Sequence, residues 1–173
     1  AHIGISFDGD ADRVIFCDEN GSIVDGDYIL AILAMHYKYK KKLFNNSIVT
    51  TKMSNLGLRK FFLKEKIKFY LSDVGDRYVV ELMKKNNCIL GGEQSGHIIF
   101  SENSFCGDGL FTALTILEII NETNLPLSKL HRNLFYKLPQ HLVNYKLSNN
   151  SDIVFKARTI NNLLDKYSKT NDC

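Results

Sequence analysis

The chain has no tryptophan, only two prolines and only four cysteines in 173 residues. The cysteines show no CxxC spacing, and two of them lie in apolar strand-like segments, where a thiol behaves as a small hydrophobe. No apolar run approaches the roughly 20 residues that span a bilayer, so we expect no membrane partner. An apolar fraction of 45% and a charged fraction of 24% are typical of a globular protein. We therefore expect a soluble protein in a reducing, cytoplasmic setting.

The net charge is also small, at +3. The basic cluster "KYKKK" (38–42) follows an amphipathic segment, where cations favour the C-terminus of a helix. Because no aromatic platform accompanies it, we expect no nucleic-acid partner. The chain begins with "AHIG", without a basic leader or an initiator Met. We expect either a processed chain or a segment of a longer protein.

The first 24 residues predict a strand, an acidic loop, a strand, a turn and a strand. Asn20 and Gly21 form the turn, where both positions tolerate positive φ. Further along, strand-like and helix-like segments alternate. Helices are expected over 27–42, capped by Asp25 or Asp27, and over 54–66, capped by Ser54. The remaining expected segments are helices over 76–86 and 108–122 and strands over 47–51, 67–72, 88–92 and 97–100.

This alternation predicts an α/β fold, in which helices cover both faces of a mostly parallel sheet. We expect a three-layer αβα domain with a mixed sheet, plus partial flanking domains. Ligand loops of such sheets lie at the carboxyl ends of the strands. After Leu125 the sequence predicts a short helix and a connector. The tail then predicts a strand, "HLVNYKL", and a helix capped by Ser151 or Asp152.

The stretch "FDGDADR" (7–13) places Asp8, Asp10 and Asp12 in one short loop between two strands. Two like charges about 4 Å apart repel by roughly 4 kcal/mol at an effective dielectric near 20. Converging carboxylates therefore need a cation, and hard oxygen ligands suit Mg²⁺. The alternative is a solvated acidic turn. We predict that Asp8, Asp10 and Asp12 are metal ligands.

Two other interpretations of this loop are less favoured. The spacing from Asp8 to Glu19 resembles an EF-hand calcium loop, but Arg13 stands where that loop needs glycine. The flanking segments are also strand-like, whereas an EF-hand needs helices. An aspartate nucleophile that becomes phosphorylated lacks its partner residues in the rest of the chain.

Arg13 directly follows the three aspartates. A guanidinium beside a bound divalent cation attracts anions, and its planar fork matches phosphate oxygens. A phosphorylated substrate is therefore one interpretation. The other is that Arg13 pairs with the neighbouring aspartates and lowers their repulsion.

The segment "LGGEQSGH" (90–97) combines glycines with an acid, an amide, a hydroxyl and an imidazole. Glycines let the backbone approach a ligand closely. Glu93, Gln94, Ser95 and His97 offer the donors and acceptors that vicinal sugar hydroxyls require. The alternative is a polar turn with a structural histidine.

Taken together, these motifs resemble the α-D-phosphohexomutase family over residues 3–147. The segments that carry the resemblance are "FDGDADR", "DGD" (25–27), "SNLG" (54–57), "VGDRYV" (74–79), "GGEQSGH" and "GDG" (107–109). "GEQSGH" and "VGDRYVVE" look most like the phosphoglucosamine mutases, since relatives acting on mannose or glucose phosphates tend to carry another residue at Gln94.

The resemblance implies an isomerase of amino-sugar metabolism, on the route to UDP-N-acetylglucosamine. An enzyme phosphoserine would convert glucosamine 6-phosphate into glucosamine 1-phosphate through a bisphosphate intermediate. It implies that Asp8, Asp10 and Asp12 hold Mg²⁺ and that Arg13 contacts phosphate. It also implies that Glu93 and Ser95 bind sugar hydroxyls and that His97 supports their loop. It leaves the roles of Lys52, Asp76 and Arg77 open.

The resemblance also implies a division of the chain. Residues 1–24 would end the second domain of a four-domain enzyme, residues 25–135 would form the third, and residues 136–173 would begin the fourth. No loop of the Ser-His-Asn type that carries the phosphoserine occurs in the chain, so we expect it to be inactive alone. The alternatives are a fragment of a phosphomannomutase or phosphoglucomutase, and a non-catalytic module that binds a divalent metal.

Overall fold

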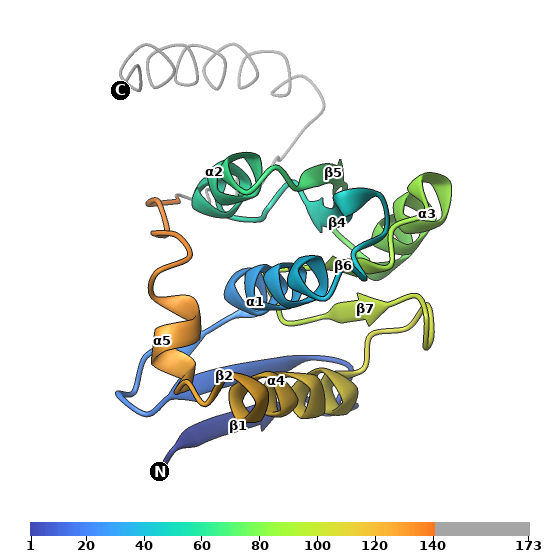
Figure 1. The fold of residues 1–173 in the computed structure, drawn as a ribbon. Coiled ribbons are helices and arrows are strands. Elements are labelled where there is room, and N and C mark those ends of the chain that lie inside the picture. The colour runs from blue at the N-terminus through green and yellow to red at the C-terminus, as the bar shows by residue number, and fades with distance from the viewer. Residues whose placement is uncertain (141–173) are drawn as a thin grey trace, which may run out of the picture. The chain divides into compact units, whose positions relative to one another are not determined.

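A small antiparallel sheet at the N-terminus holds the acidic loop (Figure 1). In this computed structural model, which describes residues 1–140, β1 (Ile3–Phe7) pairs with β2 (Val14–Asp18), and β2 pairs with β3 (Ile23–Val24). The predicted order of strand, loop, strand, turn and strand is confirmed. The tail strand and the helix predicted to follow Ser151 or Asp152 lie outside the described residues.

The turn between β2 and β3 differs from the prediction at Asn20. Gly21 has a φ of 83°, but Asn20 is not among the residues with positive φ. The Gly21 N–H donates to the Asp18 carbonyl at 3.0 Å, and the Asp18 N–H donates to the Ser22 carbonyl at 2.9 Å. The loop therefore has three residues, and a three-residue loop needs a single left-handed position.

A second, mixed sheet has the order β5-β4-β6-β7. Its strands are β4 (Ser47–Thr51), β5 (Lys68–Ser72), β6 (Leu90–Gly92) and β7 (Ile98–Phe100). β4 runs parallel to β5 and β6, whereas β6 and β7 are antiparallel. The carboxyl ends of β4, β5 and β6 consequently open onto one edge of the sheet.

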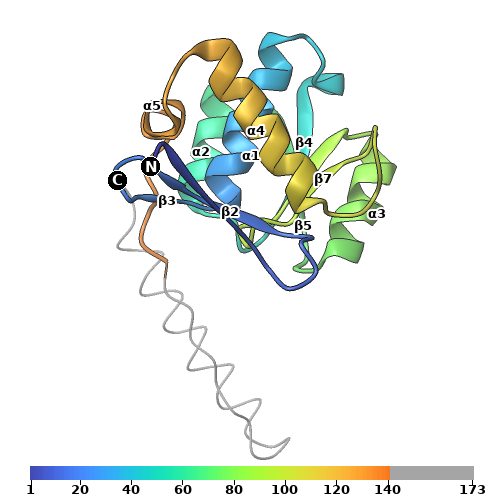
Figure 2. The ribbon, with the colours of Figure 1, turned by 90° about the horizontal axis from the view of Figure 1, so that it is seen from below.

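Helices α1 (Gly26–Tyr39) and α2 (Leu56–Lys64) cover one face of this second sheet, and α3 (Asp76–Asn86) covers the other (Figure 2). Helix α4 (Gly109–Thr123) packs against β1 and β2, and α5 (Leu127–His131) packs against α1. A short 3₁₀ turn (Phe44–Asn46) precedes β4.

Neighbouring residues of β4 show the two faces. Ile48 belongs to the main apolar core with residues of α1 and α2, whereas Val49 packs with Val79 and Met83 of α3. Successive side chains of a strand point to opposite faces, so the sheet lies between α3 and the α1–α2 layer. The predicted α/β class with a mixed, mostly parallel sheet is confirmed. Every helix in residues 1–140 is too short or too polar to cross a lipid bilayer.

The structure shows which of the predicted residues cap α1 and α2. Asp25 caps α1, and its side chain accepts from the Tyr28 N–H at 3.5 Å. Asn55 caps α2 and accepts from the Gly57 N–H at 2.9 Å, so the prediction that Ser54 caps this helix is wrong. The reason is that the Ser54 hydroxyl is hydrogen-bonded to the Thr50 hydroxyl instead.

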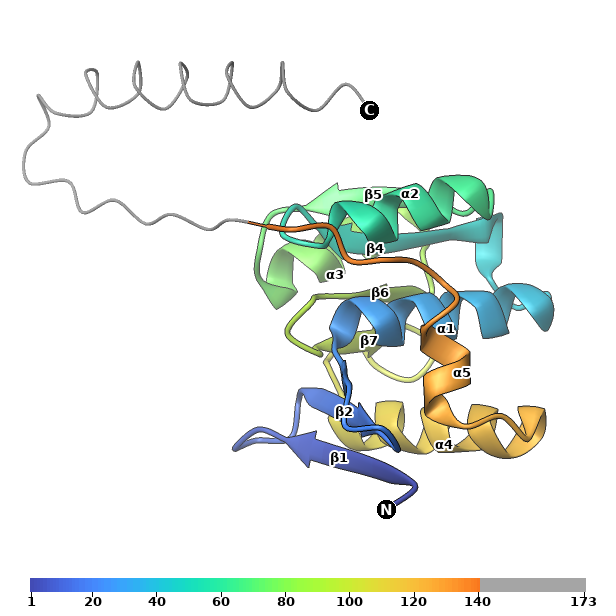
Figure 3. The ribbon, with the colours of Figure 1, turned by 90° about the vertical axis from the view of Figure 1, so that its left-hand side faces the viewer.

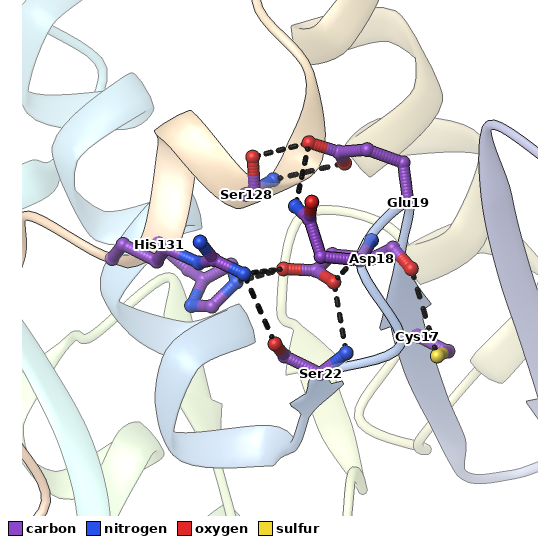
Figure 4. Close-up of polar contacts among 8 residues, drawn as sticks. Cys17, Asp18, Glu19, Ser22, Ser128 and His131 are labelled. Carbon is purple, nitrogen blue, oxygen red and sulfur yellow. Dashed lines mark hydrogen bonds and ion pairs between the residues drawn. The ribbon is translucent and has the colours of Figure 1, made fainter.

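α5 is bound to the turn between β2 and β3 through two acidic side chains (Figure 4). The Asp18 carboxylate lies 3.0 Å from His131 Nε2 and accepts from Arg132 at 3.3 Å. Beside it, the Glu19 carboxylate accepts from the Ser128 hydroxyl and from the Ser128 N–H at 3.3 Å. These contacts bind α5 to residues more than 100 positions earlier in the chain.

The segment after α5, residues 135–138, runs along α1 and α2 (Figure 3). Phe135 stacks on Tyr28 with ring centroids 4.7 Å apart. Leu138 exchanges two hydrogen bonds with the Asn55 side chain, at 2.8 and 2.9 Å. We call residues 135–138 the strap, because they connect α5 to the N-terminal end of α2.

Candidate functional site

The three predicted metal ligands converge in the loop between β1 and β2. Each of Asp8, Asp10 and Asp12 offers one carboxylate oxygen, and these oxygens all lie within 4.8 Å of one another. Ala11 turns the loop with a left-handed φ of 58°, and its N–H donates to the Asp8 carbonyl at 3.3 Å. Since strands flank the loop, the EF-hand interpretation is wrong.

The electrostatics of this loop favour a cation. Partial burial, a hydrogen bond to Asp8 and the charges of Asp10 and Asp8 raise the pKa of Asp12, against an opposing effect of His97. A divalent cation would relieve this repulsion, and hard carboxylate oxygens are the ligands that Mg²⁺ prefers. The donor set therefore fits a small, hard divalent metal ion.

Arg13 lies beside the acidic loop with about half of its side chain exposed. Its Nε is 3.7 Å from Asp8 Oδ2 and 3.9 Å from Asp12 Oδ1. This is the pairing with neighbouring aspartates that one interpretation of the sequence describes. The distances are too long for good hydrogen bonds, so the guanidinium keeps donors for another anion.

The turn 93–97 between β6 and β7 lies against the acidic loop. His97 is buried, and its Nδ1 is 3.0 Å from Asp12 Oδ2. The Val14 N–H donates to the Gly96 carbonyl at 3.1 Å, and Arg13 and His97 form an antiparallel bridge. The fold therefore brings together the two motifs that the sequence singled out, although Asp12 and His97 are 85 positions apart.

A side chain on Gly107 would collide with the His97 imidazole, because a Cβ there would lie 2.4 Å from the ring. Gly107 is the first residue of the "GDG" motif. The motif thus lets the chain pass close behind the ring and hold it next to Asp12.

A cavity of about 270 Å³ joins the acidic loop to the turn. Asp8, Arg13 and Ser95 line it, together with residues of β1 and β2. A carboxylate, a guanidinium and an exposed hydroxyl thus face one space. This combination can bind a metal ion, a phosphate group and a sugar hydroxyl next to one another.

Glu93 takes a different direction from Ser95. Its Oε1 accepts from the Gly75 N–H at 2.8 Å, and Glu93 does not line the cavity. Gly75 has a φ of 124°, a conformation that an L side chain rarely adopts. The "VGDRYV" loop therefore supplies a backbone donor to the predicted sugar-binding carboxylate.

The structure also places the residues whose roles the sequence left open. Lys52 Nζ pairs with Asp73 at 2.6 Å, at the carboxyl ends of β4 and β5. Arg77 Nε pairs with Glu81 at 2.9 Å on the exposed surface of α3. The Asp76 carboxylate accepts from the Arg77 N–H at 2.7 Å.

Sequence reasoning missed two buried residues near the turn, Asp27 and Asn55. Asp27 Oδ2 accepts from Gln94 Nε2 at 3.1 Å and from the Asn55 N–H at 2.9 Å. The signal was present, since both residues belong to motifs of the resemblance, "DGD" and "SNLG". What the sequence could not provide was the contact between those motifs.

Residues 25–138 match the family model described as phosphoglucomutase/phosphomannomutase, alpha/beta/alpha domain III. Among curated relatives, a phosphoglucosamine mutase of Clostridium botulinum (strain Kyoto / Type A2) is 47% identical over 172 residues. That alignment covers 99% of this chain and 38% of the relative. The chain thus spans well under half the length of the curated relatives it matches.

Two solved structures have a similar fold. A putative phosphomannomutase from Thermus thermophilus gives a TM-score of 0.68 at 25% identity, covering 76% of this chain and 30% of that one. An Aspergillus fumigatus N-acetylphosphoglucosamine mutase, solved in complex with GlcNAc-6P and magnesium, gives 0.67 at 20% identity, with coverages of 85% and 35%.

The family model matches the second sheet, helices α1 to α5 and the turn 93–97. The chain belongs to the phosphoglucomutase/phosphomannomutase family, the α-D-phosphohexomutases.

Proposed function

We propose that this chain is the part of a phosphoglucosamine mutase that holds the metal ion and recognises the amino sugar. The enzyme would interconvert glucosamine 6-phosphate and glucosamine 1-phosphate. The observation that carries the proposal is the cavity lined jointly by Asp8, Arg13 and Ser95. The 47% identity to a phosphoglucosamine mutase supports the choice of sugar.

In this proposal Asp8, Asp10 and Asp12 hold Mg²⁺. The ion would neutralise charge on the phosphoryl group during its transfer. Arg13 binds the phosphate of the substrate through its guanidinium donors. Ser95 and Glu93 bind sugar hydroxyls, and Gly75 orients Glu93. Buried His97 fixes the turn against Asp12.

The same proposal assigns the parts of the chain. Residues 1–24 contribute the metal loop from the end of domain 2, residues 25–135 form domain 3, and residues 136–173 begin domain 4. The phosphoserine that donates the phosphate is supplied by the rest of the enzyme. A cytoplasmic location and a role in the supply of UDP-N-acetylglucosamine are parts of this proposal.

A phosphomannomutase or phosphoglucomutase is the second candidate, and the description of the matched family model favours it. Gln94 distinguishes the two, because it belongs to the "GEQSGH" form of the turn. Glucosamine 6-phosphate, mannose 6-phosphate and glucose 6-phosphate differ at the hydroxyl or amine positions that a sugar-binding turn would contact. A comparison of the three ligands therefore separates the candidates.

The test is a calorimetric titration of the purified chain with MgCl₂, followed by each of the three hexose phosphates. Asp10→Asn removes one of three carboxylate ligands, so Mg²⁺ affinity should fall by at least about tenfold, the scale that even an outer-shell change produces. Asp73→Asn is the matched control, because its carboxylate is exposed and lies outside the acidic loop.

The proposal requires that Mg²⁺ bind the wild-type chain and that glucosamine 6-phosphate bind more tightly than the other two sugars. A preference for mannose 6-phosphate or glucose 6-phosphate would favour the second candidate. Binding of Mg²⁺ that Asp10→Asn leaves unchanged would overturn the metal site. A preference for Ca²⁺ without sugar binding would favour a non-catalytic metal module.

A further inference from the structure

Asp27 is a buried carboxylate in the first turn of α1, with 1% of its surface exposed. Burial raises the pKa of Asp27, and the hydrogen bond from the Asn55 N–H opposes that effect. A buried carboxylate is costly unless donors surround it. Its Oδ2 accepts from Asn55 and from Gln94, which lie on different loops. The carboxylate therefore joins three segments of the chain.

Gln94 is held to α1 by its backbone as well as by its side chain. The Gly26 N–H donates to the Gln94 carbonyl at 3.0 Å, and the Gln94 amide donates to Asp27 at 3.1 Å. Gln94 does not line the cavity that Ser95 borders. The Gln94 amide is thus directed to the protein and not to the cavity.

The other donor to Asp27 extends the connection to the strap. The Asn55 side chain accepts from the Leu138 N–H at 2.9 Å and donates to the Leu138 carbonyl at 2.8 Å. A continuous set of hydrogen bonds therefore runs from Gln94 through Asp27 and Asn55 to Leu138. The carboxylate lies at the middle of this set.

We propose that Asp27 is a positioning residue that holds the turn 93–97 in its substrate-binding conformation by accepting the hydrogen bond of the Gln94 side chain. The inference rests on the proposed function of this turn. Ser95 and Glu93 flank Gln94, so the place of Ser95 at the cavity and the contact of Glu93 with Gly75 depend on where the Gln94 amide is held. Gln94 would then influence sugar selectivity without contacting the sugar.

Two substitutions test this contact. Gln94→Glu places a second carboxylate against Asp27 and removes the donor. Gln94→Met removes the donor without adding charge, and serves if Gln94→Glu does not fold. Methionine is unbranched and has nearly the length and volume of glutamine, so Gln94→Met also separates the hydrogen bond from the space that the side chain fills.

The primary measurement is amide hydrogen exchange by NMR on the purified 173-residue chain, read at the Glu93 and Gly96 N–H groups. Both groups donate within the turn, to the His97 and Glu93 carbonyls at 3.0 Å. Each Gln94 single substitution should accelerate their exchange about tenfold or more, the scale of a hydrogen bond to a charged group.

Asn103→Asp is the matched control, since it adds the same charge on an exposed turn. It should leave the Glu93 and Gly96 exchange rates unchanged. A merely space-filling role for Gln94 predicts that Gln94→Met leaves both exchange rates unchanged, because the volume of the side chain is kept. That result would overturn the inference.

Titration with glucosamine 6-phosphate separates this inference from the proposed function. If the wild-type chain binds the sugar, the single variants should bind it at least about tenfold more weakly, following the loss of turn order. If the wild-type chain binds no hexose phosphate, the proposed function fails. In that case the exchange rates still decide whether Asp27 holds the turn.

Discussion

Asp18 carries a negative charge in a place that water does not reach, since its side chain is fully buried. Burial alone would raise the pKa of this carboxyl. The N–H groups of Ser22 and Asn20, the His131 ring and the Arg132 guanidinium more than offset that effect and hold its pKa well below the usual range. The charged form of Asp18 therefore stabilises the fold, and it does so by attaching α5 to the hairpin.

The first prediction concerns this charge. Asp18→Asn should lower the free energy of unfolding at pH 7 by about 3 kcal/mol, because it leaves a buried donor set without its anion. A depressed carboxyl pKa contributes stability above about pH 4, and this is lost as the pH falls through the folded-state value. The difference between wild type and variant should therefore shrink in acid.

Urea unfolding between pH 7 and pH 3 measures this difference. Glu81→Gln removes a carboxyl that is more than half exposed and should change the unfolding free energy by no more than about 0.5 kcal/mol. A difference between wild type and Asp18→Asn that stays constant with pH would contradict the assignment of the stabilising charge to Asp18.

At the scale of elements, the N-terminus of α1 packs against the turn 93–97 with no room for a side chain. A Cβ on Gly26 would lie 1.9 Å from the Glu93 carbonyl oxygen and 2.7 Å from the Gly96 nitrogen. Both atoms are backbone and cannot rotate away. The absence of a side chain at Gly26 therefore lets the helix and the turn 93–97 approach each other closely.

Gly26→Ala should for this reason destabilise the fold by about 2 kcal/mol, as overpacking does. This predicted loss of stability is opposite to the effect of helix propensity, which alone would favour alanine by about 1 kcal/mol. Chemical denaturation measures the effect. Gly9→Ala is the control, because a Cβ at Gly9 would meet no atom within 4 Å. A stabilised Gly26→Ala variant would contradict the close approach.

The sequence predicted most elements, because apolar periodicity and capping residues act locally. α3 begins and ends at the predicted residues, Asp76 and Asn86. The cap of α2 was misplaced by one residue, because Ser54 and Asn55 are both good caps and the choice depends on Thr50 from the preceding strand. The local sequence identifies the candidate capping residues, and tertiary contacts decide which of them caps the helix.

At the scale of the whole molecule, the strap adds an aromatic side chain to the α1–α2 layer. Phe135 is 8% exposed and lies 4.7 Å from the Tyr28 ring and 6.0 Å from the Phe61 ring, centroid to centroid. Phe135→Ala should lower the free energy of unfolding by about 3 kcal/mol. It should also increase proteolysis at the strap.

The neighbouring residue provides the control for this prediction. Tyr136 is 86% exposed, so Tyr136→Ala should change the unfolding free energy by no more than about 0.5 kcal/mol. Equal effects of the two substitutions, measured by urea unfolding, would show that the strap does not pack on the helices.

The candidate site was predictable only in part. The spacing of Asp8, Asp10 and Asp12 indicated that their carboxylates point to one place, because side chains at alternate positions of a tight loop can converge. The contact between Asp12 and His97, and the shared acceptor at Asp27, were not predictable from spacing. Such contacts depend on which loops the topology brings to one edge, and a single sequence does not encode that as a local pattern.

The distance along the chain between Asp12 and His97 also sets the order of events during synthesis. A nascent chain that has left the ribosome only as far as α3 contains all three aspartates but neither the imidazole nor Ser95. The buried Asp18 carboxylate of the hairpin gains its His131 partner later still, when residue 131 has been translated. The acidic loop and the hairpin are therefore made before the later segments that their residues contact.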